Sequence, residues 1–163
     1  MGDRVLEEAL ALAGGAPDAV AVVECDPALA DTAEFCANYG YALEDSANTI
    51  IVAAKTDPRR YVACVVLAHS RLDVNGVVRK RLGARKASFA SAAETPKLSG
   101  MEIGGVTPFG LPPELELWID RRVMERDQVI VGGGGRDRKL VVAPAVLAAR
   151  AATSLVDDLA RAG

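Results

Sequence analysis

A loop at residues 100–110 contains the residue types best suited to holding a reacting group. Within it, the adjacent Gly104 and Gly105 let the backbone adopt positive φ or let another molecule approach the main chain closely. Pro108 fixes its own φ and restricts Thr107 to an extended conformation, so the sequence predicts a rigid loop whose N–H groups face outward. Such N–H groups can hold a carbonyl, a carboxylate or a phosphate. A tight connection that binds nothing is the alternative.

A second glycine-rich segment, residues 132–135, consists of four consecutive glycines between two apolar segments. It does not match the pattern GxxxxGK[ST] and is not followed by a convincing helix, so a nucleotide-binding P-loop is not favoured. Gly133 and Gly134 are candidates for a second wall of a pocket or for a loop that approaches phosphate. A flexible turn is the alternative.

The densest group of basic residues lies between residues 79 and 86. At the end of a helix such charges complement the helix dipole and need no partner. They can also contact nucleic-acid phosphates, which makes Lys80, Arg81, Arg85 and Lys86 candidate phosphate contacts. Aromatic residues are not interleaved with them, so a general binder of single strands is not favoured.

Composition excludes several classes of protein. With 163 residues, half of them apolar, the chain is long enough for one domain, residues 1–163, with a sizeable core. A net charge of −3 does not indicate a dedicated nucleic-acid binder. Cys25, Cys36 and Cys64 lack CxxC spacing, which argues against a disulfide framework and a zinc site and favours buried thiols. His69 has no acidic partner at motif spacing, so neither a Ser-His-Asp triad nor a metal site is predicted.

The N-terminus has no basic stretch followed by an apolar run and a cleavage site. Charges such as Asp18 and Arg150 interrupt the apolar segments before they reach membrane-spanning length. We therefore expect a soluble, cytoplasmic protein with no membrane partner and no cofactor.

Both strands and helices must position the candidate site residues. The β-branched segments 49–54 and 61–68 predict a hairpin, and their near-continuous apolarity indicates strands covered on both faces. The segment 114–119 alternates acidic with apolar residues, as an edge strand does. Further strands are predicted at 19–24, 86–89, 129–131 and 139–142, and helices at 3–13, 31–39, 73–82, 92–98 and 145–161. Interspersed strands and helices predict a single domain of mixed α/β class.

Asp3 and Asp31 are the predicted N-caps of the first two helices, and Glu34 stands at the capping-box position of the second. The first helix is expected to end at Gly14-Gly15 and the second at Gly40.

Four stretches resemble, in order, the YbaK/prolyl-tRNA synthetase-associated domain family. The loop Gly104-Gly105-Val106-Thr107-Pro108-Phe109-Gly110 is similar to the family's Gly-Gly-x-x-Pro-x-Gly loop. The other resemblances are RLDVN with LGARKA at 71–75 and 82–87, NTIIV at 48–52 and VGGGGR at 131–136. Together they cover about residues 20–150, nearly a whole domain. The resemblance implies a curved mixed sheet, partly closed like a barrel, surrounded by helices.

The resemblance also implies an activity, the hydrolysis of mischarged aminoacyl-tRNA. Gly104 and Gly105 would then polarise the ester carbonyl, and Val106, Thr107 and Pro108 would bind the aminoacyl end. Water or a ribose hydroxyl would attack, since positioning alone supplies much of such a rate. Replacing Gly105 by Ala is expected to abolish turnover with little loss of fold. The implied partners are the acceptor end of aminoacyl-tRNA, contacted by the basic residues above, and an aminoacyl-tRNA synthetase; the oligomeric state is left open.

Asn48 departs from the family pattern, which has Lys at this position in many members. That Lys is held to contact the terminal adenosine or its phosphate, a role that a neutral amide cannot carry over ionically. Asn48 can hydrogen-bond a ribose hydroxyl or a carbonyl, or it can serve as a turn residue at the strand entry. The departure keeps a second hypothesis open, a non-catalytic module that binds an aminoacyl-tRNA end or a synthetase. Asn48→Lys discriminates the two, because a gain of deacylation indicates a pocket that has drifted.

Overall fold

The structure, a computed structural model, describes residues 3–14, 16–101 and 105–162. Its helices are α1 (Arg4–Leu12), α2 (Thr32–Tyr39), α3 (Arg79–Arg81), α4 (Glu94–Ser99) and α5 (Pro144–Ala148), with 3-10 turns at Pro17–Ala19, Pro27–Leu29, Leu43–Asp45 and Arg121–Glu125 and a π-helical turn at Val74–Val78. Its strands are β1 (Val20–Glu24), β2 (Ala47–Ala54), β3 (Arg60–Leu67), β4 (Ser70–Leu72), β5 (Ala87–Phe89), β6 (Glu116–Asp120), β7 (Val129–Gly132), β8 (Arg138–Val142), β9 (Thr153–Val156) and β10 (Ala160–Ala162).

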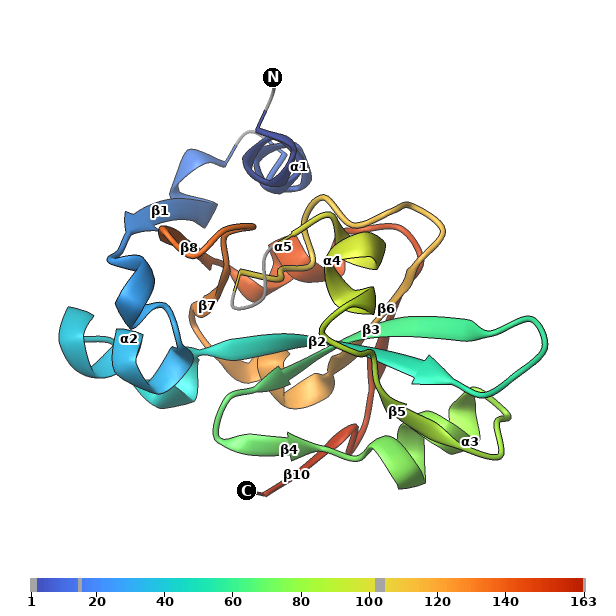
Figure 1. Ribbon diagram of the computed structural model, residues 1–163. Helices are drawn as coiled ribbons and strands as arrows, with labels where there is room; N and C mark the ends of the chain where they lie inside the picture. The colour runs from blue at the N-terminus through green and yellow to red at the C-terminus, as the bar shows by residue number, and fades with distance from the viewer. Residues whose placement is uncertain (1–2, 15, 102–104, 163) are drawn as a thin grey trace.

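The strands form three sheets (Figure 1). A mixed sheet has the order β5-β2-β3-β6-β9, an antiparallel sheet has the order β1-β8-β7, and β4 pairs with β10. The predicted mixed α/β class is therefore confirmed. The partly barrel-like closure is not confirmed, because within the described residues the edge strands β5 and β9 do not pair with each other.

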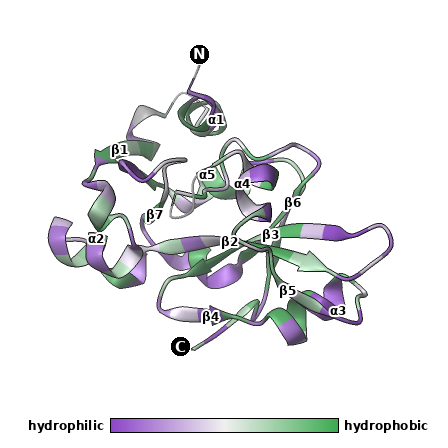
Figure 2. Ribbon diagram, viewed as in Figure 1, coloured by the Kyte–Doolittle hydropathy of each residue, from purple (hydrophilic) through white to green (hydrophobic). Residues whose placement is uncertain are grey.

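The predicted hairpin is confirmed and forms the centre of the fold. β2 and β3 pair antiparallel from Ala47 opposite Leu67 to Ala54 opposite Arg60. Alternate residues of a strand face opposite sides of the sheet. Both faces of β3 are buried, with one cluster receiving Ala63, Val65 and Leu67 and another receiving Val62, Cys64 and Val66. Figure 2 shows this apolar run along β2 and β3.

The prediction of an edge strand at 114–119 is wrong. β6 lies inside the mixed sheet and runs parallel to both β3 and β9. Leu117 and Trp118, which face opposite sides, are 0% and 4% exposed. The acidic side chains that suggest a solvated face, Glu114 and Glu116, lie at and before the entry of the strand rather than along it.

The predicted helix at 145–161 is also largely wrong. Only α5 is helical there, and the chain then forms β9 and β10. Ala152 and Asp158 adopt positive φ, at 58° and 54°. The turn at Ala152 follows α5 and precedes β9, and the turn at Asp158 separates β9 from β10. The predicted helix at 73–82 begins instead with a π-helical turn, capped by Asp73, before the single turn of α3.

Candidate active site

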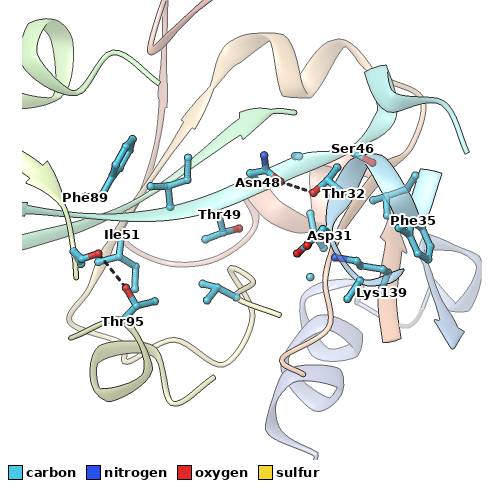
Figure 3. A pocket seen from close by; sticks show the side chains of 18 residues that line it. Asp31, Thr32, Phe35, Ser46, Asn48, Thr49, Ile51, Phe89, Thr95 and Lys139 are labelled. Carbon is cyan, nitrogen blue, oxygen red and sulfur yellow. Dashed lines mark hydrogen bonds between the residues drawn. The ribbon is translucent and has the colours of Figure 1, made fainter. Parts of the chain in front are cut away.

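A cavity of about 310 Å³ lies where the start of α2, the strand β2 and the strands β7 and β8 meet. Its volume is within the range of small-molecule sites. Aliphatic side chains form much of its wall, among them Ala47, Ile51, Val106 and Ile130. Its polar lining residues, labelled in Figure 3, are Asp31, Thr32, Ser46, Asn48, Thr49, Thr95 and Lys139.

One wall of this cavity is an open edge of β2. The neighbouring strand β5 pairs only with residues 52–54 of β2, and beyond it the N–H of Ala90 donates to the carbonyl oxygen of Ile51 at 2.8 Å. Alternate residues of an antiparallel strand direct their N–H and C=O groups to the same edge, so Thr49 directs its backbone groups to the edge that Ile51 uses. No described strand pairs with β2 at Thr49 on that side. A ligand can therefore hydrogen-bond to main-chain groups there.

Thr32, the first residue of α2, joins the helix to β2. Its Oγ1 donates a hydrogen bond of 2.9 Å to Oδ1 of Asn48, drawn as a dashed line in Figure 3. With Oδ1 engaged, the amide nitrogen of Asn48 retains two N–H donors for a ligand. Asn48 therefore lines the cavity, and its side chain is oriented by a specific partner.

Asp31 stands at the N-cap position of α2, but its side chain makes no capping hydrogen bond. The predicted capping interaction is therefore wrong. The Asp31 carboxylate lines the cavity instead, and its Oδ1 lies 3.4 Å from Nη1 of Arg136. Gly40 ends the helix with φ of 76°, as predicted.

Lys139 lines the cavity although no sequence pattern predicts it as a site residue, and the same holds for Asp31, Thr32 and Thr49. The Lys139 side chain enters the cavity from β8 and is only 7% exposed. Its Nζ lies 5.8 Å from the ring centre of Phe35. Burial lowers the pKa of Lys139 below its ordinary value. A buried ammonium beside a cavity is suited to an anionic or carbonyl oxygen of a ligand, and such groups concentrate at functional sites.

Thr49 carries a buried hydroxyl whose Oγ1 has no hydrogen-bond partner among the described residues. Thr107 and Thr153 share this property, but of the three only Thr49 lines the cavity. An unpaired buried hydroxyl is destabilising, and such exceptions call for an explanation. A polar group of a ligand in the cavity would give Thr49 Oγ1 a hydrogen-bond partner.

The two glycine-rich segments pack backbone to backbone. The N–H of Gly134 donates to the carbonyl oxygen of Gly105 at 2.7 Å. A Cβ at Gly105 would lie 2.6 Å from the carbonyl oxygen of Gly135, and one at Gly132 would lie 2.8 Å from that of Gly105. The close approach therefore requires glycine on both sides. The expectation that Gly105→Ala leaves the fold nearly intact is corrected, because the atoms in its way are backbone.

The predicted loop residues separate into two groups. Val106 lines the cavity, whereas Gly105, Thr107 and Pro108 are buried without lining it. Gly104 lies outside the described residues. The role of the loop N–H groups in binding a carbonyl therefore stays a prediction.

The predicted second wall is formed by Gly132 rather than by Gly133 and Gly134. Gly132 lines the cavity, while the next two glycines line a separate cavity of about 560 Å³ beside Asp3 and Arg138. Arg138 pairs with the Asp3 carboxylate and donates from Nε to the carbonyl oxygen of Gly133 at 2.9 Å. The structure thus assigns these two glycines a contact to the start of α1 and does not bring them together with Asn48.

The four candidate phosphate contacts, Lys80, Arg81, Arg85 and Lys86, are exposed and do not line the cavity. The guanidinium of Arg81 lies 5.0 Å from the ring centre of Trp118. Figure 1 places α3 at the lower right, whereas α2, β7 and β8 lie on the left. Their contact with tRNA stays a prediction.

The cysteines are free and buried, as expected. Burial raises the pKa of the Cys64 thiol to about 12, so it is not a nucleophile at neutral pH. The described residues contain no group of three or more His, Cys, Asp or Glu side chains placed to hold a metal ion. Among the same residues, no helix has the length and apolar character needed to cross a membrane.

Comparison with characterised proteins identifies relatives. The multifunctional Ser/Thr-tRNA deacylase ProXp-y of Escherichia coli K12 is 28% identical over 105 residues, which cover 63% of this chain and 62% of that protein. The protein of the same name from Escherichia coli O157:H7 matches to the same extent. The chain thus spans less than two thirds of the length of these relatives.

Solved structures share the fold over nearly the whole chain. The crystal structure of hypothetical protein APE2540 matches with a TM-score of 0.81 and 26% identity, covering 96% of this chain and 99% of that chain. A candidate trans-editing enzyme for prolyl-tRNA synthetase matches with a TM-score of 0.75 and 21% identity, covering 96% and 98%. Residues 26–149, which include Asn48, the described part of the glycine loop and Lys139, match the model of the aminoacyl-tRNA editing domain. The chain therefore belongs to the aminoacyl-tRNA editing domain family.

Proposed function

We propose that the protein hydrolyses the ester bond of mischarged aminoacyl-tRNA and holds the aminoacyl group in the cavity at the open edge of β2. The observation that carries this proposal is the buried ammonium of Lys139 in a cavity of a chain that matches the editing domain. An aminoacyl ester presents a carbonyl, an α-ammonium group and a ribose hydroxyl, and each needs a partner of opposite character.

The proposed roles follow from charge and position. Water adds to the ester carbonyl carbon and gives up a proton, and the carbonyl oxygen becomes negative. The bond between that carbon and the ribose oxygen then breaks as the ribose oxygen takes up the proton, which releases the free amino acid and the tRNA. Lys139 stabilises the negative oxygen. Asp31 pairs with the α-ammonium group of the substrate, and the N–H groups of Asn48 donate to the ribose or the carbonyl.

The Gly-Gly-x-x-Pro loop contributes to this site through Val106, which lines the cavity. The contact between Gly105 and Gly134 supports this placement, because it fixes the loop against the turn that follows β7. We keep the loop N–H groups, Gly104 included, as proposed partners of the carbonyl. The assignment of residues 1–163 to one editing domain and the partnership with a synthetase stay predictions.

The proposed substrates carry a small hydroxylated amino acid. The unpaired hydroxyl of Thr49 would gain a partner from the side chain of Ser or Thr. A site built to hydrogen-bond a substrate hydroxyl discriminates strongly against an analogue that lacks it. The relatives named as Ser/Thr-tRNA deacylases support the same choice.

A deacylation panel tests the proposal. The wild-type protein and Lys139→Met are incubated with tRNA charged with Ser, Thr, Ala, Cys or Pro, and release of the amino acid is followed over time. The proposal expects release of Ser or Thr by the wild type and a much slower release by Lys139→Met. If no charged tRNA is hydrolysed while binding persists in a titration, the protein is the non-catalytic module that Asn48 in place of Lys favours.

A further inference from the structure

A second cavity, of about 680 Å³, adjoins the first across one side chain. Phe89, the last residue of β5, lines both cavities. It is 60% exposed, more than any other large hydrophobic side chain that the structure describes. In Figure 3 it lies at the end of the first cavity away from Lys139. An exposed ring at the junction of two cavities is a surface on which a nucleic-acid base can stack.

Two arginines line the second cavity. Arg71 of β4 and Arg161 of β10 are direct partners across the antiparallel ribbon. Like charges directly opposite each other destabilise a strand pair. Asp73 offsets part of this repulsion, since its Oδ2 accepts from Nη2 of Arg161 at 3.0 Å. The cavity lining still has two guanidinium groups to one carboxylate, and a phosphate between the arginines would remove the remaining repulsion.

The order of the groups matches a chain that leaves the first cavity. Next to Phe89, Ala90 bonds to Ile51 at the beginning of the open edge of β2, so the ring stands where that edge meets β5. Ser88 and Asn75 add polar side chains to the second cavity. Unpaired RNA is recognised by such a combination of a stacking ring, cations and polar groups that reach the base edges.

We propose that the second cavity binds the nucleotides that precede the aminoacylated 3′ end of the RNA, with a base stacked on Phe89 and a phosphate held by Arg71 and Arg161. The proposal rests on the proposed function, because it takes the first cavity to hold the aminoacyl end. It adds an aromatic platform for a base and places the path of the RNA along β4, β5 and β10.

Binding of a short oligoribonucleotide that ends in CCA, labelled with fluorescein at its 5′ end, tests the proposal without catalysis. Phe89→Leu keeps an apolar side chain but removes the ring, and we expect its Kd for the oligonucleotide to rise about tenfold. Phe89→Trp keeps an aromatic ring and should bind as tightly as the wild type. Arg71→Ala should reduce the slope of log Kd against log salt by about 0.7. Arg121→Ala is the matched control, because Arg121 is exposed, pairs with Asp157 and lines neither cavity.

Two substrates separate this proposal from the proposed function. Aminoacyl-adenosine carries the ester but lacks the preceding nucleotides, whereas aminoacyl-tRNA carries both. We expect Phe89→Leu and Arg71→Ala to lower kcat/KM for aminoacyl-tRNA about tenfold more than for aminoacyl-adenosine. Two results would overturn the inference. One is an equal loss of kcat/KM on the two substrates, and the other is that Phe89→Leu and Arg71→Ala bind the oligonucleotide as tightly as Arg121→Ala does. If the wild type hydrolyses neither substrate, the proposed function fails, and the oligonucleotide titration still decides whether RNA occupies the second cavity.

Discussion

The N–H of Gly134 donates a hydrogen bond to the carbonyl oxygen of Gly105 across 2.7 Å. This contact joins two glycine-rich segments that are separated by almost thirty residues in the sequence. It also connects the candidate site to the first helix, because Arg138 bonds both the carbonyl oxygen of Gly133 and the carboxylate of Asp3. The position of Val106 in the cavity therefore depends on packing among backbones.

Gly105→Ala tests this dependence. The added Cβ would meet the backbone of Gly135, so we expect a loss of about 1–3 kcal/mol in the free energy of unfolding together with a loss of deacylation. Thermal melting and a deacylation assay measure the two effects. Gly14→Ala is the control. Gly14, just after α1, has a φ of 63°, which strains an alanine, but an added Cβ would meet no other atom. This variant should therefore lose stability and keep its activity. An unchanged melting temperature for Gly105→Ala would contradict the packing account.

Thr49→Val removes a buried hydroxyl and keeps the branched shape. Because Oγ1 lacks a partner among the described residues, we expect the variant to be more stable by about 1 kcal/mol and yet to hydrolyse Ser-tRNA and Thr-tRNA about tenfold more slowly. Hydrolysis of Ala-tRNA should change little. Thr153→Val is a matched control, since it removes an equally unpaired hydroxyl outside the cavity and should affect stability alone. Equal rates for Thr49→Val and the wild type on Ser-tRNA would refute the assigned contact.

Lys139→Met separates a functional lysine from a structural one. The lowered pKa of Lys139 means that burial disfavours its charged form, so we expect an apolar side chain of similar length at this position not to lower the free energy of unfolding. The value of kcat/KM for deacylation should fall on the order of 100-fold, as for the loss of a group that stabilises a negative oxygen. Lys55→Met, at the exposed tip of the β2–β3 hairpin, controls for the loss of one positive charge. A variant that unfolds while its remaining folded fraction is fully active would identify Lys139 as structural.

The structure predicts the direction in which Asn48→Lys changes stability and activity. Lysine cannot accept the hydrogen bond from Thr32, and its ammonium would enter a cavity that already contains that of Lys139. We expect lower stability and lower activity rather than the gain that a drifted pocket predicts. Asn48→Asp retains the acceptor and serves as the comparison. Faster deacylation by Asn48→Lys, measured on the same charged tRNA, would show that Lys139 does not supply the cation of the site.

Asp3 makes stability depend on pH in the acidic range. Its hydrogen bond with Arg138, and a second from the N–H of Leu6, lower its pKa from 3.8 to about 2. A carboxyl whose folded pKa is depressed stabilises the fold above its unfolded pKa, and this contribution is lost as pH falls from about 4 to about 2. Asn is also a good N-cap, so Asp3→Asn isolates the charge. The melting temperatures of the two proteins should differ at pH 5 and converge near pH 2; a constant difference would contradict the assignment.

Local patterns predicted the elements whose partners are close in sequence. The hairpin of β2 and β3 follows from two β-branched segments and a short connection. The start of α1 follows from its N-cap Asp3, and the end of α2 follows from Gly40. The prediction of a helix at 145–161 was wrong because the helix propensity of its Ala-rich sequence is only a weak preference. β9 and β10 are stabilised by pairing with β6 and β4, far earlier in the chain, which no local pattern contains.

The site was predicted in part for the same reason. Asn48 and Val106 belong to motifs and line the cavity, whereas Lys139 lines it but belongs to no motif that the sequence analysis recognised. Val141 indicates the position of Lys139, because the two residues share a face of β8 and Val141 packs against the apolar cluster that contains Phe35. The close contact of the glycine segments and the exposure of Phe89 depend on the tertiary fold, so the sequence alone contains no sign of either.

The release of amino acid from tRNA charged with Ser or Thr, followed with the wild type and with Lys139→Met, tests the central claim most directly. The account predicts turnover by the wild type and a rate on the order of 100-fold lower for a folded Lys139→Met. Equal rates for the two proteins, or no release by the wild type from any charged tRNA, would contradict it.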